Sequence, residues 1–224
     1  MTSVAIKIGD KSVLLDETAA KAAYNVLAHS IHADNVAAGW WHSLEDGRRT
    51  NLLASRNRGE MLMLCITELS EAEEANDTYA RDDKLPNHMG LHVEIADCAI
   101  RILDLLGAEA SLHGGDPIVT LRGKHDYMFF GQAMSEFLQF GRRGVQGDLM
   151  RIARDLSKAL DDGYRKGNTQ HGRYWLSTAF YRIVALCYLD NIELFEIIEE
   201  KRAFNRQRAD HKPENRIKEG GKKC

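Results

Sequence analysis

The sequence is poor in proline and cysteine. Its 224 residues include 3 prolines and 4 cysteines, and the cysteines form no CxxC pair and no cysteine–histidine spacing typical of zinc sites. We therefore expect free thiols in a reducing compartment. The shortage of proline and of β-branched runs favours helices over strands.

Long apolar runs are also missing. A membrane-spanning helix needs about 18 apolar residues, and Arg182 interrupts the best candidate, Tyr174 to Leu189. Residues Met1 to Asp10 lack the basic-then-apolar pattern of a signal peptide. We therefore expect a cytoplasmic protein that has no membrane partner.

The formal net charge of −3 argues against a nucleic-acid partner. This charge is unevenly distributed, because residues 201–224 hold nine basic and three acidic residues and carry +6, which leaves −9 on the remainder. Such a basic segment binds a phosphate-bearing partner or docks on the acidic body of the same chain. The sequence leaves both interpretations open.

Hydrophobic periodicity predicts an all-α fold, with a short hairpin around Gly9-Asp10 as the exception. Asp16 and Asn57 are placed to cap helices, and Gly107 is placed to end one. The aromatic residues between 127 and 140 have helical spacing typical of a core. Helices are expected over residues 17–38, 57–79, 91–106, 127–140, 148–165, 173–189 and 192–208.

Two pairs of carboxylates stand in apolar surroundings on consecutive helices. Glu68 and Glu71 are three residues apart, as are Glu94 and Asp97, so each pair lies on one helical face. Helices joined by a short connection usually pack antiparallel, which allows the pairs to meet. Four desolvated carboxylates repel one another unless a cation compensates, and oxygen ligands suit Mg²⁺ or Mn²⁺. The alternative is a pair of solvated helix faces.

The spacing ExxE, 22 residues, ExxD resembles the signature of the MazG-like, all-α NTP pyrophosphatase superfamily. Gly39-Trp40-Trp41 before the first carboxylate helix and the K-x-x-x-N-x-x-R pattern formed by Lys201, Asn205 and Arg208 are similar to features of that family. Asp210-His211-Lys212-Pro213 and Gly220-Gly221-Lys222 resemble the tails of phage-type members. Residues 108–190 are longer than in compact members, which implies a helical insert in a single domain of residues 1–208, followed by a basic tail at 209–224.

The resemblance implies a Mg²⁺-dependent enzyme, with Mn²⁺ as a substitute, that cleaves a nucleoside triphosphate between its α and β phosphates. Residues Glu68, Glu71, Glu94 and Asp97 would bind the metal. Family members are dimers or tetramers, so a homo-oligomer is expected. Some phage-type relatives act on guanine nucleotides, which makes dGTP or GTP the favoured substrate.

The roles of the other site residues follow less directly. Glu71 is the proposed general base, because a nearby acidic partner such as Glu74 is expected to favour proton uptake by it. Lys201, Asn205 and Arg208 share a helical face that binds phosphates, or else they form a solvated helix end. Trp40 and Trp41 are candidates for stacking on a base, with one of them expected in the core.

Three other functions stay open. The same chemistry on an alarmone or a phosphoribosyl nucleotide is one. A non-catalytic helical interaction module, whose carboxylates form salt bridges with the basic tail, is another. A protein that binds nucleic acid through that tail is the third, and its affinity would fall steeply with salt.

Overall fold

The computed structural model describes residues 3–8, 11–42, 57–119, 144–209 and 212–216. Strands β1 (Ser3–Ile8) and β2 (Lys11–Asp16) pair antiparallel, with Ser3 opposite Asp16 and Ile8 opposite Lys11. All other regular elements in the described ranges are helical, which confirms a helical fold. They are α1 (Glu17–Ala37), α3 (Arg58–Thr78), α4 (Gly90–His113), α6 (Gly144–Lys158), the π-helix η1 (Ala159–Gly163), the 3₁₀ helix η2 (Tyr164–Lys166), α7 (Thr169–Leu189), α8 (Leu194–Gln207) and α9 (Pro213–Arg216).

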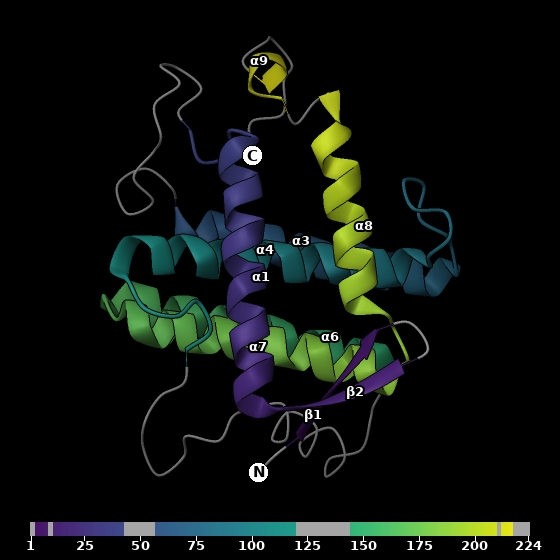
Figure 1. The fold of residues 1–224 in the computed structure, drawn as a ribbon, viewed down its shortest axis with the longest axis horizontal. Helices are drawn as coiled ribbons and strands as arrows, with labels where there is room; N and C mark the ends of the chain where they lie inside the picture. The colour runs from purple at the N-terminus through teal and green to yellow at the C-terminus, as the bar shows by residue number, and fades with distance from the viewer. Residues whose placement is uncertain (1–2, 9–10, 43–56, 120–143, 210–211, 217–224) are drawn as a thin grey trace.

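The helices cross in two directions. Helices α3, α4, α6 and α7 run side by side, and α1 and α8 lie across them (Figure 1). Helix α4 is central, because it packs against α1, α3, α7 and α8. It is buried on most of its circumference, with Ile95, Ala99, Ile102 and Leu106 fully shielded from solvent. Every element that frames the site described below packs on α4 or connects to it.

Helix α4 extends beyond the end expected from the sequence. Gly107 does not end the helix, which continues to His113, so that expectation was wrong. A Cβ atom added at Gly107 would lie 2.6 Å from the Ala28 carbonyl oxygen and 2.8 Å from the His32 Cβ. The glycine therefore serves a different purpose: it lets α1 cross α4 with their backbones nearly in contact.

The second half of the chain contributes directly to the same core. Helices α6 and α7 pack together, and buried residues of both, such as Ile152 and Phe180, belong to one hydrophobic cluster with α3 and α4. The expected helix over 148–165 is present as α6 continued by η1 and η2, and α7 begins four residues before the expected start. The expected helix at 127–140 lies outside the described residues.

Other expected helix ends agree closely with the structure. Helix α1 ends one residue before the expected end, and the Asn57 side chain accepts a hydrogen bond from the Gly59 amide at 2.9 Å, as a cap of α3. Helix α8 is shorter than expected by two residues at its start and one at its end. Within the described residues, no helix combines the length and apolar character needed to cross a bilayer.

We expect Gly107→Ala to destabilise the protein, because the new methyl group would collide with the backbone of α1. Overpacking of this kind costs about 1–3 kcal/mol, measured as the free energy of unfolding in urea. Gly59→Ala is the control, since its nearest contact is the end of the Asn57 side chain at 3.1 Å; we expect a change below about 1 kcal/mol there. Equal effects of the two variants would contradict the tight α1–α4 crossing.

Candidate metal and phosphate site

One face of α4 carries polar side chains. Glu94, Asp97, Arg101 and Asp104 follow at spacings of three, four and three residues, which places them on a single helical face. Most residues between them are buried in the core. The strong burial of the rest of α4 therefore fixes the direction of this polar face.

Helix α3 supplies the facing carboxylates. Glu68 is buried and lies among the core residues Cys65, Leu69 and Ala72. Glu71, about one turn further along α3, is exposed. The packing of α3 on α4 brings both glutamates to the pocket that the polar face of α4 borders.

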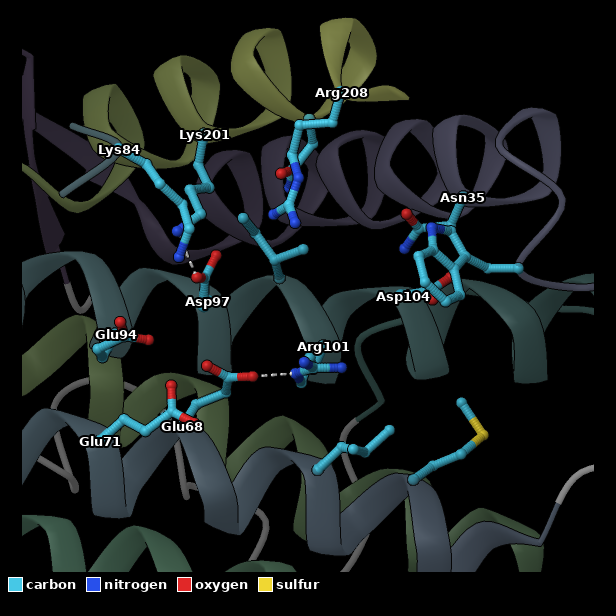
Figure 2. Close-up of a pocket in the computed structure, with 15 residues that line it drawn as sticks. Asn35, Glu68, Glu71, Lys84, Glu94, Asp97, Arg101, Asp104, Lys201 and Arg208 are labelled. Atoms are coloured by element: carbon cyan, nitrogen blue, oxygen red, sulfur yellow. Dashed lines mark hydrogen bonds and ion pairs between the residues drawn. The ribbon is translucent and has the colours of Figure 1, made fainter. Parts of the chain in front are cut away.

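A pocket of about 230 Å³ lies between α3, α4 and α8, and we call it the α3–α4–α8 pocket (Figure 2). Its wall combines carboxylates, basic side chains, amides and a few apolar groups. The lining residues are Asn35, Trp40, Met61, Leu64, Glu68, Glu71, Lys84, Glu94, Asp97, Ile100, Arg101, Asp104, Lys201, Asn205 and Arg208.

Three carboxylates come close together in this pocket. Glu68, Glu94 and Asp97, the acidic triad, each offer an oxygen within 4.8 Å of the others. Burial raises the pKa of Glu94 to about 8, assisted by a hydrogen bond with Glu68 and by the negative charges of Asp97 and Glu68. Burial also raises the pKa of Asp97 to about 6, against the lowering effect of Lys201.

Two basic side chains partly neutralise the acidic triad. The Arg101 Nε donates to Glu68 Oε1 at 2.5 Å, and the Lys201 Nζ lies 2.6 Å from Asp97 Oδ2. Burial alone would lower the pKa of Lys201, but the combined attraction of Asp97, Asp82 and Glu94 outweighs it and the pKa is raised. The triad thus holds three carboxylates against two cations, and this imbalance adds to the effect of burial on the pKa of Glu94.

The triad has the chemistry of a site for a hard divalent cation. Its donors are carboxylate oxygens, which Mg²⁺ and Mn²⁺ prefer, and it contains none of the histidine or cysteine ligands typical of zinc. Glu71, the fourth expected metal ligand, lines the same pocket but lies outside the triad.

Helix α8 brings the expected phosphate-binding residues to the opposite wall. Lys201, Asn205 and Arg208 all line the pocket, and Lys201 and Arg208 enter it from the side of α8 (Figure 2). The Asn205 Oδ1 is buried and has no hydrogen-bond partner among the residues that the structure describes. An unsatisfied buried acceptor is costly, so this atom is available to a donor on a ligand.

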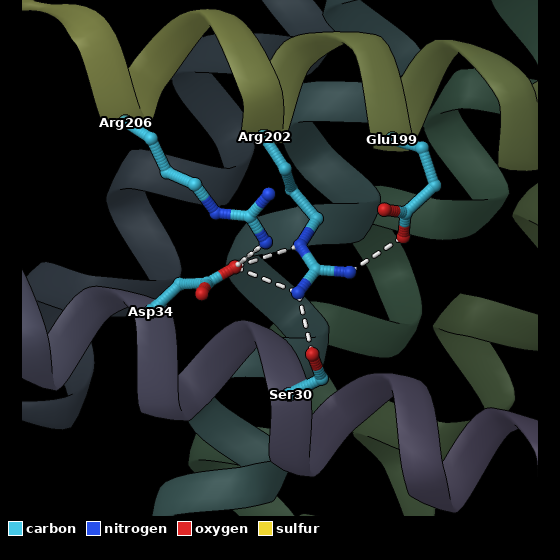
Figure 3. A network of polar contacts seen from close by, with 5 residues as sticks. All are labelled: Ser30, Asp34, Glu199, Arg202 and Arg206. Atoms are coloured by element: carbon cyan, nitrogen blue, oxygen red, sulfur yellow. Dashed lines mark hydrogen bonds and ion pairs between the residues drawn. The ribbon is translucent and has the colours of Figure 1, made fainter.

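A separate polar network holds α8 against α1. Asp34 accepts hydrogen bonds from Arg202 Nε at 2.9 Å and from Arg206 Nη2 at 2.8 Å, and Arg202 also contacts Ser30 and Glu199 (Figure 3). Arg202 is buried, whereas Arg206 is exposed. Arg202 and Lys201 are adjacent in sequence, so the anchoring of one restrains the backbone that carries the other.

The two tryptophans have different surroundings. Trp41 is 2% exposed and donates from Nε1 to Asp104 Oδ1 at 3.0 Å, while His32 Nδ1 lies 2.8 Å from the same oxygen. Trp41 is therefore the core residue of the pair and is not part of the pocket wall. Trp40 is half-buried and lines the pocket.

Sequence reasoning missed several pocket residues. Arg101 follows Asp97 by four residues, so helical spacing alone placed it on the same face as the carboxylates. Lys84 and Asn35 carried no such signal, because their positions depend on how the α3–α4 connection and α1 pack. Of the tail, residues 210–211 and 217–224 lie outside the described ranges.

Comparison with family models, with characterised proteins and with solved structures finds no match to this chain. The resemblance to the MazG-like superfamily therefore rests on the motifs quoted above and stays a prediction.

We expect Mn²⁺ to bind the purified protein more tightly as the pH rises from 6 to 8. Binding must displace the proton that the raised pKa of Glu94 retains, so affinity should increase by up to about tenfold per pH unit and level off above pH 8. Isothermal titration calorimetry measures this. Glu94→Gln should bind more weakly and lose most of the pH dependence; an affinity that is constant from pH 6 to 8 in the wild type would contradict the site.

We expect Arg202→Met to lower the free energy of unfolding by about 1–3 kcal/mol, because it removes the buried partner of Asp34. Arg206→Met is the matched control on the same helix. Its side chain is exposed, so its loss should cost less than about 1 kcal/mol. Urea denaturation of both variants tests the difference, and equal losses would show that burial of Arg202 does not anchor α8.

Proposed function

We propose that the chain is a metal-dependent nucleoside triphosphate pyrophosphohydrolase that releases a nucleoside monophosphate and pyrophosphate. One observation carries the proposal: three clustered carboxylates and the basic side chains of another helix line one pocket. Carboxylates bind divalent cations, and lysine and arginine bind phosphates. A metal–nucleotide complex presents both partners at once.

The metal ligands in this proposal are Glu68, Glu71, Glu94 and Asp97. When bound there, Mg²⁺ would neutralise charge on the phosphates and lower the pKa of a coordinated water. The donor set of the pocket suits this cation, because three carboxylate oxygens lie within 4.8 Å of one another.

The protein residues supply orientation and proton transfer. Lys201 and Arg208 would bind phosphate oxygens, and Glu71, the exposed carboxylate of the pocket, would accept the proton of the attacking water. The water oxygen forms a bond to the α phosphorus, and the bond from this phosphorus to the bridging oxygen breaks. Pyrophosphate then leaves with the electron pair.

The remaining lining of the pocket suits a nucleoside. Trp40 offers an aromatic face, and Met61, Leu64 and Ile100 supply apolar surface beside the amides of Asn35 and Asn205. We therefore place the base there, with guanine nucleotides as the first substrates to test. A homodimer or homotetramer stays a prediction of the resemblance, and a cytoplasmic location stays a prediction from the sequence.

A second candidate is a non-catalytic interaction module. The ion pairs Asp97–Lys201 and Glu68–Arg101 favour it, because they satisfy part of the acidic triad within the chain. Within the part of the chain that the structure describes, however, Glu94 has no ion pair of its own, so the salt-bridge explanation is incomplete. The following experiment separates the two functions.

We expect the wild-type protein to release pyrophosphate from at least one canonical NTP or dNTP with Mg²⁺ or Mn²⁺. Glu68→Gln and Glu94→Gln should lower the rate by at least about 100-fold, the upper end of the loss seen for residues that only support metal ligands. Asp77→Asn is the control, because Asp77 is exposed on the same helix and is not a pocket residue. No release by the wild type, or unchanged rates in both pocket variants, would contradict the proposal.

A further inference from the structure

The connection between α3 and α4 is firmly built. Asp82 is buried, and its Oδ1 accepts hydrogen bonds from the backbone amides of Lys84 at 3.0 Å and Leu85 at 2.6 Å. The Arg81 Nη1 donates to the Asn87 carbonyl at 2.7 Å. This segment therefore holds the backbone of Lys84 in a defined position.

The same connection is tied to α8. The His88 Nε2 lies 2.9 Å from the Oε2 of Glu200, and Glu200 directly precedes Lys201 on α8. Leu85 also packs against the core. The connection and α8 are thus linked at the end of the pocket that holds Asp97.

Lys84 reaches into this end of the pocket. Its side chain and that of Lys201 extend toward Asp97 from two different elements (Figure 2). The carboxylate paired with Lys84 in the described structure is Asp83, at 3.5 Å and highly exposed. A surface pair of this kind contributes little, so the Lys84 ammonium is available to a ligand.

The charge balance of the pocket indicates which ligand this is. Among the described lining residues there are five carboxylates and four basic side chains. A single divalent cation would reverse the resulting net charge of −1 to +1, and a second would add to the positive charge. Two ammonium groups beside a metal-bearing triad then favour an anion with several charged oxygens.

We propose that Lys84 binds the outer phosphates of the substrate, and hence the pyrophosphate that leaves. This inference rests on the proposed function and extends it, since it assigns a lysine outside the recognised motif to the leaving group. Lys201 and Lys84 would hold the outer phosphates from two sides, while the carboxylates hold the metal.

The test measures binding of pyrophosphate and of dGMP in the presence of Mg²⁺ by isothermal titration calorimetry. We expect Lys84→Ala to weaken pyrophosphate binding about tenfold, the loss of one charge-assisted contact, with less than a twofold change for dGMP. Lys84→Arg should retain most of the affinity. Lys166→Ala is the matched control, because Lys166 pairs with Asp162 on η1 and η2 and is not a pocket residue.

The inference is overturned if the wild type binds no pyrophosphate, if Lys84→Ala matches Lys166→Ala, or if Lys84→Ala weakens both ligands equally. Its failure is distinct from failure of the proposed function. A protein that hydrolyses nucleotides but binds pyrophosphate equally well without Lys84 retains the function and refutes the inference. A protein that binds pyrophosphate through Lys84 but hydrolyses no nucleotide supports the binding role of Lys84 and refutes the proposed function.

Discussion

The site depends on like charges held together in a half-buried space. The packing of α3 on α4 places Glu68, Glu94 and Asp97 within 4.8 Å of one another, and this packing is driven by apolar residues rather than by the carboxylates. The ion pairs with Arg101 and Lys201 offset part of the electrostatic cost, and burial together with the neighbouring carboxylates raises the pKa of Glu94. A divalent cation is the partner that would relieve all three carboxylates at once.

Much of the candidate site could be predicted from the sequence, because residue spacing along a helix determines which side chains share a face. The two carboxylate pairs at three-residue spacing come to one pocket, as do Lys201, Asn205 and Arg208. Which side chains share a face is a property of a single helix and needs no knowledge of the tertiary fold. That these faces meet depends on the packing of α3 and α8 on α4. Arg101 belongs to the same category, since it lies one turn beyond Asp97.

The residues that could not be predicted depend on packing between elements. The sequence does not reveal which of Trp40 and Trp41 is buried, because the answer depends on Asp104, more than 60 residues away. Lys84 reaches the pocket through a connection whose shape is fixed by Asp82. Glycine is common at helix ends, but the role of Gly107 is set by the path of α1 across α4.

The crossing at Gly107 and the pocket carboxylates lie on two faces of the same helix, α4, so their relative orientation is fixed. Asp97 directs its carboxylate to the pocket, and ten residues later Gly107 admits α1. An α-helix rotates by about 100° per residue. One residue inserted or deleted between these positions would turn the carboxylates away from α3 while α1 remained seated on the glycine. Length variation in homologous chains should therefore be confined to segments outside this part of α4, such as the connections before Gly90 and after His113.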